Sequence, residues 1–303
     1  MIEKVKEIMS EISVAQIKWS LRRLYWGLPK KFLVLEVGSG GNPCPRSDIL
    51  VDYSTGEHEK SRGLVSDRPV FLCAGEELPF TDKQFDFVIS FHNLEHSKNP
   101  RKFLNEMQRV AKAGYIETPS SAHEVLFPYK FHSSLIWKDN DKLHIKMKSH
   151  WDDPLRVDLS KSLMTNLTAT KEFIGFYRNN PRVFNTSFYW NDNINFEIHN
   201  EGISQSWEDS DKYQEYAHQL AGNSIKSKLR NIIPRYIRKI MGYSKRNVDI
   251  LSLLKCVACS ETNYKKIENK DSVDFVCKSC GSIVSQKYNF FHSNEFTTLG
   301  KEQ

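Results

Sequence analysis

Short apolar runs alternate with amphipathic stretches over the first 120 residues of the chain. The runs at 32–37, 49–51, 70–72, 85–91 and 115–117 are rich in β-branched and aromatic residues, and turn-forming residues bound them. Such runs are typical of parallel strands that are buried on both faces. The pattern therefore predicts an α/β fold in which helices cover both faces of a parallel sheet.

Two helices are predicted around these strands. Residues 2–26 carry apolar side chains at helical spacing, and Gly27 ends the pattern. A second helix is expected between the last two strands, because Asn99 is a suitable N-cap and Pro100 suits the first helical position.

The middle of the chain has a different pattern. Residues 131–148 and 184–198 are each predicted to form a β-hairpin around an Asp/Asn-rich turn, with Trp137 and Trp190 at corresponding places. We expect the two hairpins to form a lid, and residues 158–178 between them to be helical. The two tryptophans either stack on sugar rings or pack in the core.

Positive charge is concentrated in one segment. Residues 224–246 contain eight of the lysines and arginines and no acid, so the net charge of +6 leaves −2 for the rest of the chain. This balance does not indicate a globally basic, nucleic-acid-binding surface. The amphipathic stretch 224–241 leaves three interpretations open: a linker helix, a helix on an anionic membrane surface, or a contact with nucleic-acid phosphates. The last would use Lys226, Lys228, Arg230, Arg235, Arg238 and Lys239.

Composition sets the general class of protein. A chain of 303 residues with 39% apolar and 26% charged residues is typical of folded proteins and has room for about two domains. No stretch approaches the roughly 18–20 apolar residues of a membrane span. The first residues mix acids and bases without an apolar core, so no secretory signal is predicted. We expect a cytoplasmic location, with a peripheral position at the inner face of the membrane as an option.

Four of the six cysteines form two CxxC pairs separated by residues 260–276. In a cytosolic chain this spacing favours metal binding over disulfides and falls within the range of four-cysteine zinc ribbons. With four soft ligands and no further reactive partner nearby, the pattern predicts a closed, structural Zn²⁺ site. The predicted ligands are Cys256, Cys259, Cys277 and Cys280.

A glycine-rich turn follows the first predicted strand, in the sequence VLEVGSGGNP at 34–43. Open α/β sheets bind ligands at the carboxyl ends of their strands, and Asp52 ends the second strand where an acid commonly holds ribose hydroxyls. From the residues alone, a tight strand–helix turn without a ligand remains the alternative.

Residues 33–120 as a whole resemble the class I S-adenosylmethionine-dependent methyltransferases, in particular the group with the ubiquinone/menaquinone-biosynthesis enzymes. The shared pieces, in order, are the EVGSG loop, the EELPF and FDFVIS stretches, the LEH turn and a helix ending in RVAKAG. The resemblance implies a Rossmann-like sheet with β-hairpin insertions and S-adenosylmethionine as the cofactor. The residues it implies for cofactor binding are Glu36, Gly38, Ser39, Gly40, Asp52, Gly75, Glu76, Ser90 and Phe91.

One position departs from the family pattern. Ala74 stands where the family usually has an acid that binds the adenine amine, so adenine recognition is expected to be weaker unless Glu76 substitutes. Methyl transfer itself depends largely on alignment, but a hydroxyl acceptor also needs a base, for which histidine is suited. We expect His92, and after it His132, in this role; a histidine at the polar rim is the alternative for either.

The cysteine-containing segment resembles the small zinc-ribbon proteins that activate tRNA and protein methyltransferases, over about 45 residues. Val257 replaces the usual proline after the first cysteine. The resemblance implies that this segment is a fused module with a stabilising or docking role.

Four parts are therefore expected: N-terminal helices at 1–30, a methyltransferase domain at 31–205, a basic linker at 206–247 and a zinc ribbon at 248–303. The leading hypothesis is O-methylation of a glycan or of a lipid-linked precursor. The expected partner is therefore a small-molecule or glycan acceptor. An RNA methyltransferase that uses the basic helix and ribbon, and a non-catalytic cofactor-binding scaffold, are the alternatives.

Overall fold

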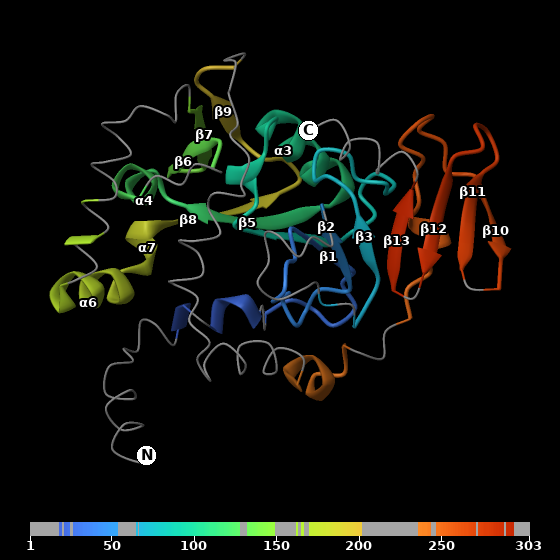
Figure 1. Ribbon diagram of the computed structural model, residues 1–303, viewed down its shortest axis with the longest axis horizontal. Coiled ribbons are helices and arrows are strands. Elements are labelled where there is room, and N and C mark those ends of the chain that lie inside the picture. The colour runs from blue at the N-terminus through green and yellow to red at the C-terminus, as the bar shows by residue number, and fades with distance from the viewer. Residues whose placement is uncertain are drawn as a thin grey trace.

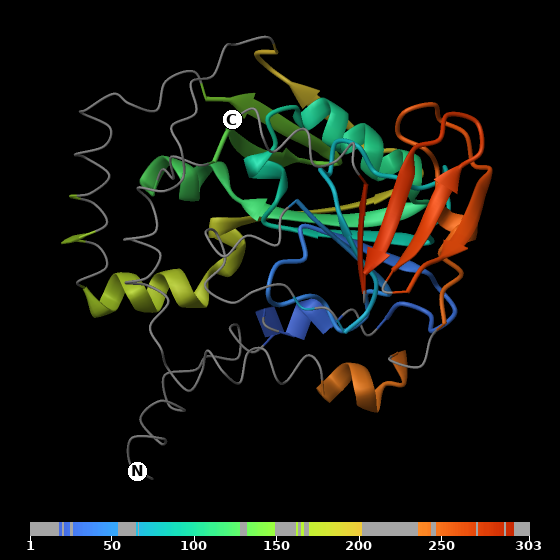
Figure 2. The same cartoon turned by 45° about the vertical axis from the view of Figure 1, so that its right-hand side comes forward.

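A ten-stranded twisted sheet runs through the molecule in the computed structural model, with α3 (Pro100–Val110) on one face and η1 (Arg22–Leu24) on the other, and a second sheet has three strands (Figures 1 and 2). No helix among the described residues is long and apolar enough to cross a membrane. The structure describes residues 18–19, 21–24, 27–53, 65, 67–127, 132–148, 162, 165–166, 170–201, 236–243, 247–270, 272–287 and 289–293.

The predicted parallel strands are confirmed. They are β1 (Val34–Val37), β2 (Ile49–Asp52), β3 (Val70–Leu72), β4 (Phe87–Phe91) and β5 (Ala113–Pro119). Their order in the sheet is β3-β2-β1-β4-β5, and all four neighbouring pairs are parallel. The order reverses between β1 and β4, which is the point where open α/β sheets bind ligands.

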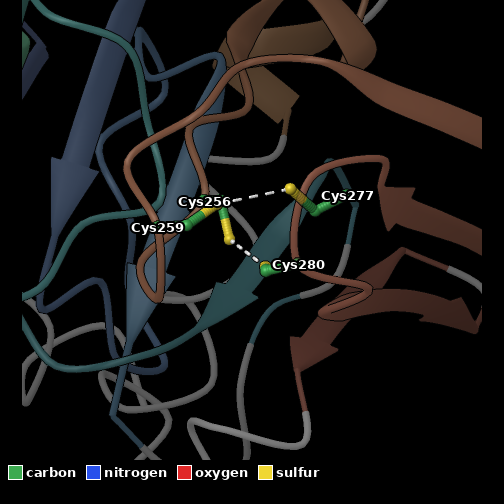
Figure 3. A group of neighbouring side chains, drawn as sticks. All are labelled: Cys256, Cys259, Cys277 and Cys280. Atoms are coloured by element: carbon green, nitrogen blue, oxygen red, sulfur yellow. Dashed lines mark hydrogen bonds between the residues drawn. The ribbon is translucent and has the colours of Figure 1, made fainter.

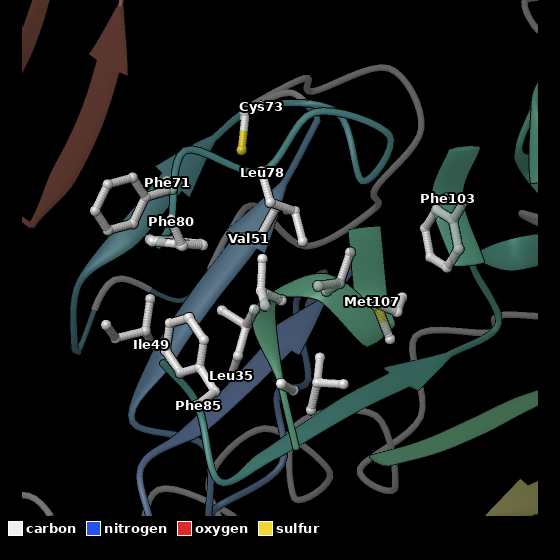
Figure 4. Close-up of a cluster of buried hydrophobic side chains, with 14 of the residues drawn as sticks. Leu35, Ile49, Val51, Phe71, Cys73, Leu78, Phe80, Phe85, Phe103 and Met107 are labelled. Carbon is white, nitrogen blue, oxygen red and sulfur yellow. The ribbon is translucent and has the colours of Figure 1, made fainter. Parts of the chain in front are cut away.

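Helix α3 (Pro100–Val110) covers one face of the sheet as predicted. The Asn99 side chain accepts a hydrogen bond from the Lys102 amide at 2.9 Å, which is an N-cap. Phe103 and Met107 of α3 belong to the large apolar cluster that fills this face (Figure 4). Other members of that cluster labelled in Figure 4 are Leu35, Ile49, Val51, Phe71, Cys73, Leu78, Phe80 and Phe85.

The first predicted hairpin is confirmed and the second is wrong. Strands β6 (Ser134–Asp139) and β7 (Lys142–Met147) pair antiparallel. In the second region, β8 (Asn185–Asn191) pairs with β5, whereas β9 (Phe196–Ile198) pairs in parallel with β7.

The physical reason lies in the alternation of β8, which turns Phe188 and Trp190 into the core. Trp190 occupies the space above Gly114, where a β-carbon would lie 2.7 Å from the indole ring. It is therefore a core residue and is not available to stack on a sugar.

Three short helices complete this part: α4 (Ser121–Leu126), α6 (Lys171–Asn179) and α7 (Pro181–Phe184). Helix α6 falls in the predicted helical stretch 158–178, nine residues of which lie outside the described residues. The same holds for most of the predicted N-terminal helix.

The cysteine module, the described residues of 248–293, continues the central sheet. After η5 (Leu251–Leu253), strands β10 (Tyr264–Glu268), β11 (Val273–Cys277), β12 (Ile283–Lys287) and β13 (Phe290–Ser293) form an antiparallel meander. Strand β13 then pairs in parallel with β3, which makes one ten-stranded sheet.

The junction between β13 and β3 is apolar and tightly packed. The rings of Phe71 and Phe291 stack at 4.5 Å between centroids and 10° between planes, and Phe291 has no exposed surface. Backbone hydrogen bonds join Val70 to Asn289 and Thr81 to Leu253. The cysteine module therefore shares the core of the parallel sheet.

The basic segment is described only from residue 236. Its helical turn places Arg238 in the interior, where the guanidinium donates to the carbonyls of Pro45 and Ser47 at 3.0 and 2.6 Å. Burial lowers the pKa of Arg238 to about 10. The nucleic-acid interpretation, one of the three left open for this segment, counted Arg238 among its phosphate ligands, and the buried guanidinium is not available for that contact. Lys239 is exposed, and Lys226, Lys228, Arg230 and Arg235 lie outside the described residues.

Candidate functional site

The glycine loop after β1 has a backbone that only glycine readily adopts. Gly38 and Gly40 have φ of +76° and +54°, in the left-handed region. A β-carbon at Gly38 would also lie 2.5 Å from the side chain of Asn93. The Gly40 amide donates to a carboxylate oxygen of Asp52 at 2.7 Å, so the loop is fixed to the end of β2.

Three buried polar side-chain atoms at this end of β1 and β4 have no hydrogen-bond partner among the described residues. They are Oε1 of Glu36, Oγ of Ser39 and Oγ of Ser90. The other oxygen of Glu36 accepts from the Cys44 amide at 2.8 Å and from Ser47 Oγ at 2.6 Å. Burial raises the pKa of Glu36. Because unpaired buried polar atoms are costly, this set fits a polar ligand that would occupy the loop.

Three further predicted cofactor residues lie around this loop. Gly75 leaves no room for a side chain, since a β-carbon would lie 2.4 Å from the ring of Phe103. Glu76 accepts a hydrogen bond from Ser97 Oγ at 2.5 Å. Phe91 packs edge-on against Tyr115 at 5.5 Å in the smaller apolar cluster. The cofactor roles of these residues stay predictions.

His92 lies directly after β4 between two buried carboxylates. Its Nδ1 is 3.5 Å from Glu95 and its Nε2 is 3.3 Å from Glu117, while 43% of the side chain is exposed. Desolvation lowers its pKa, but the two carboxylates outweigh this and raise the pKa of His92 to about 9. The imidazole is therefore a cation at neutral pH in this arrangement. Its φ of +50° is a strained value for histidine.

Glu117 at the end of β5 is held by three donors. Arg22 binds both of its oxygens, at 2.7 and 2.5 Å, and the Tyr115 hydroxyl donates at 2.6 Å. Burial by itself raises the pKa of Glu117, but Arg22 and His92 lower it to about 2. The N-terminal turn that carries Arg22 is thereby fastened to the carboxyl end of the sheet.

His132 belongs to a second charged group near Glu95. Its Nδ1 hydrogen-bonds Glu124, whose other oxygen accepts from Lys148 Nζ at 2.6 Å. The His132 ring lies edge-on to that of His96, with centroids 4.7 Å apart. The two histidines predicted as bases, His92 and His132, therefore both lie close to the buried carboxylate of Glu95.

Several residues of this site escaped the sequence analysis. Arg22, Glu95, Glu124 and Lys148 come from four separate segments, and nothing in their local sequence separates them from ordinary surface charges. The LEH turn offered the one local signal, because it places Glu95 three residues after His92, close to the end of β4.

The four cysteines of the CxxC pairs converge (Figure 3). Cys256 and Cys280 have their sulfurs 3.5 Å apart, those of Cys259 and Cys277 are 3.6 Å apart, and all four lie within 4.8 Å of one another. Tetrahedral ligands at the usual Zn–S length of about 2.3 Å lie roughly 3.8 Å apart. The sulfur arrangement therefore fits a tetrahedral zinc ion.

Comparison with known proteins agrees with the site. Residues 35–116 match the family model described as a methyltransferase domain. An uncharacterized protein of Methanocaldococcus jannaschii is 44% identical over 91 residues, which are 29% of this chain and 42% of that protein. The sarcosine/dimethylglycine N-methyltransferase of Aphanothece halophytica is 30% identical over 101 residues, 29% of this chain and 36% of the enzyme. The matches thus span less than half the length of these relatives.

Among solved structures, the YcgJ protein of Bacillus subtilis aligns with a TM-score of 0.31 and 14% identity, over 58% of this chain and 94% of that one. The family match covers the glycine loop and the parallel strands, and it indicates a methyltransferase domain in that segment. The matched segment contains the loop, Asp52 and His92, and it ends one residue before Glu117.

Proposed function

We propose that the protein transfers a methyl group from S-adenosylmethionine to an oxygen atom of a glycan or a lipid-linked precursor. The observation that carries the cofactor is the set of buried, unpartnered atoms of Glu36, Ser39 and Ser90 beside the glycine loop. They match the polar amino-acid end of that cofactor, and Asp52 at the next strand end suits its ribose hydroxyls. The family match over residues 35–116 supports the same cofactor.

The reaction needs an aligned donor and acceptor. The acceptor oxygen gives an electron pair to the methyl carbon, the carbon–sulfur bond breaks with its pair passing to sulfur, and S-adenosylhomocysteine leaves. The hydroxyl proton passes to a base. Holding both partners in line supplies much of the rate acceleration.

Of the two predicted bases, His132 has the more suitable surroundings. A carboxylate on one imidazole nitrogen orients the ring and stabilises the cation that forms when the other nitrogen takes a proton. Glu124 is in this position for His132. His92 already carries a proton at neutral pH while it contacts Glu95 and Glu117. In this state it suits the binding of an anionic or polar group of the acceptor and cannot act as a base.

An extended acceptor is favoured by an aromatic platform on the β6-β7-β9 sheet. Trp137, His144 and His199 lie with centroids 5.1–5.3 Å apart in every pair and planes within 16° of parallel. All three pairs are stacked, so the rings form one aromatic cluster on this sheet. Aromatic side chains of this kind pack against the apolar face of a sugar ring.

The four cysteines are proposed to hold Zn²⁺ as a structural ion. Cys256, Cys259, Cys277 and Cys280 would supply all four ligands, leaving no open position for a substrate. The ion would tie together the two turns at one end of β11, next to the junction with β3.

The test is calorimetric titration of the zinc-loaded protein with S-adenosylhomocysteine, with Asp52→Ala alongside. Micromolar binding that weakens at least tenfold in the variant is expected. Absence of binding at millimolar ligand would overturn the proposal. Transfer of labelled methyl to glycan and lipid-linked acceptors then tests the second half, and Trp137→Ala should raise KM for a sugar acceptor with little effect on kcat.

A further inference from the structure

A second cluster of metal-ligand side chains lies apart from the cysteines. Glu95, His96 and His132 each present one donor atom, and these atoms lie within 4.8 Å of one another. Glu95 and His96 come from η2 (Leu94–His96), which follows β4, and His132 immediately precedes β6. The cluster is therefore assembled from two segments of the fold.

Glu95 is the unusual member of this group. Its side chain is 1% exposed, and neither carboxylate oxygen has a hydrogen-bond partner among the described residues. The nearest cationic atoms are Nδ1 of His92 at 3.5 Å and Nε2 of His96 at 4.0 Å, both to the same oxygen. These contacts are long and neither is a hydrogen bond, which is costly for a buried carboxylate, so Glu95 suits the direct binding of a further cation.

The separations fit an ion between the groups. Metal–nitrogen and metal–oxygen bonds of roughly 2.0–2.2 Å place two ligands of one ion at most about 4.3 Å apart. The 4.0 Å between Glu95 and His96 is within this limit, and all three donor atoms lie within 4.8 Å of one another, so small side-chain movements bring them to one ion.

His132 has the surroundings of a metal-binding histidine. Such residues almost always donate their other ring N–H to a carboxylate, which fixes the tautomer and the ring orientation. The Nδ1 of His132 is bonded to Glu124, and Lys148 balances the charge of Glu124 at 2.6 Å. Lys148 thus compensates the negative charge of Glu124. The carboxylate of Glu95 is the one that suits an additional cation.

We propose that Glu95, His96 and His132 bind a divalent first-row transition metal. Two imidazoles and one carboxylate are the donor set that suits Fe²⁺, Co²⁺, Ni²⁺ or Zn²⁺. His96 is 39% exposed, so solvent reaches the site, and an open coordination position remains for water or another oxygen ligand.

The site is next to the glycine loop. Asn93, whose side chain borders Gly38, immediately precedes η2, and the His92 amide donates to the Glu117 carbonyl at 2.7 Å. If the proposed methyl transfer is correct, an ion held by these residues would polarise the acceptor hydroxyl, which would take over the task given above to a histidine base. This use rests on the proposed function, whereas binding of the metal does not.

The experiment is equilibrium dialysis of the zinc-loaded protein against Co²⁺, followed by elemental analysis for both metals. The protein is loaded with one Zn²⁺ per chain, which the four thiolates take, so the second site is open and Co²⁺ reports it. We expect one Co²⁺ per chain at micromolar free metal, with a visible spectrum that lacks thiolate charge-transfer bands. Glu95→Gln and His96→Gln should each weaken binding by tenfold or more, and Glu124→Gln by about tenfold through His132.

The matched control is His292→Gln, which removes a partly exposed histidine on β13, outside the cluster, and should bind Co²⁺ as the wild type does. No Co²⁺ on the wild type at 1 mM, or equal binding by His96→Gln, would overturn the proposal. His96 is half-exposed, so its variant folds even if Glu95→Gln does not. S-adenosylhomocysteine titration of the same samples separates the two proposals: Co²⁺ without cofactor binding refutes the methyl transfer alone, and the reverse refutes the metal site alone.

Discussion

Replacing Phe291 by alanine tests whether the cysteine module and the parallel sheet unfold as one unit. Phe291 has no exposed surface and stacks on Phe71 of β3, so its removal leaves a cavity at the junction. Truncations of this kind cost about 3–5 kcal/mol. At roughly 2.1 cal/mol/K per residue, unfolding of 303 residues carries about 0.6 kcal/mol/K, so Tm should fall by roughly 5–8 °C.

Differential scanning calorimetry of the zinc-loaded protein is the assay. The wild type should unfold in one transition that contains both parts, and Phe291→Ala should move that whole transition. Ile267→Ala is the matched control, because Ile267 is 38% exposed on β10 of the same module and should shift Tm by less than about 2 °C. Two separate transitions, of which Phe291→Ala moves only the smaller, would refute the shared core.

Three further predictions concern the site and the cysteines. Gly75→Ala should destabilise the fold by about 1–3 kcal/mol in urea unfolding, because its β-carbon would meet Phe103 at 2.4 Å; an unchanged midpoint would contradict this. Glu117, with its pKa lowered from 4.5 to about 2, contributes stability that is complete above pH 4.5 and is lost as the pH falls toward 2, by roughly 3 kcal/mol. Unfolding at pH 5 and pH 3 should show a smaller loss for Glu117→Gln than for the wild type, and an equal loss would refute the role of Glu117. Cys280→Ser should release zinc to a chelator and lower Tm, whereas Cys73→Ser should retain the metal.

Local signals predicted much of this molecule. The parallel strands, the N-cap of α3 and the glycine loop each depend on neighbours in sequence, and so do the two CxxC turns. The same logic explains why the position of His92 could be predicted. His92 directly follows a buried strand and thus lies at the carboxyl edge of the sheet.

Contacts between distant segments could not be predicted from the sequence. A Trp-containing stretch was predicted as a second hairpin, but β8 instead completes the sheet beside β5, because the missing side chain of Gly114 accommodates Trp190. The buried position of Arg238 and the charged groups around Glu95 depend equally on segments far apart in the chain. Periodicity and spacing carry no information about such pairings.

The pairing of β13 with β3 has a consequence for assembly inside the cell. An open strand edge attracts other strands, and β13 occupies the edge that β3 would otherwise present. A separate subunit would protect that edge only when its concentration exceeded its dissociation constant. A covalently attached partner is present at an effective concentration on the order of millimolar, so every newly made chain carries its own protection in a fixed one-to-one ratio. Protection of this edge therefore does not depend on the concentration of a separate protein.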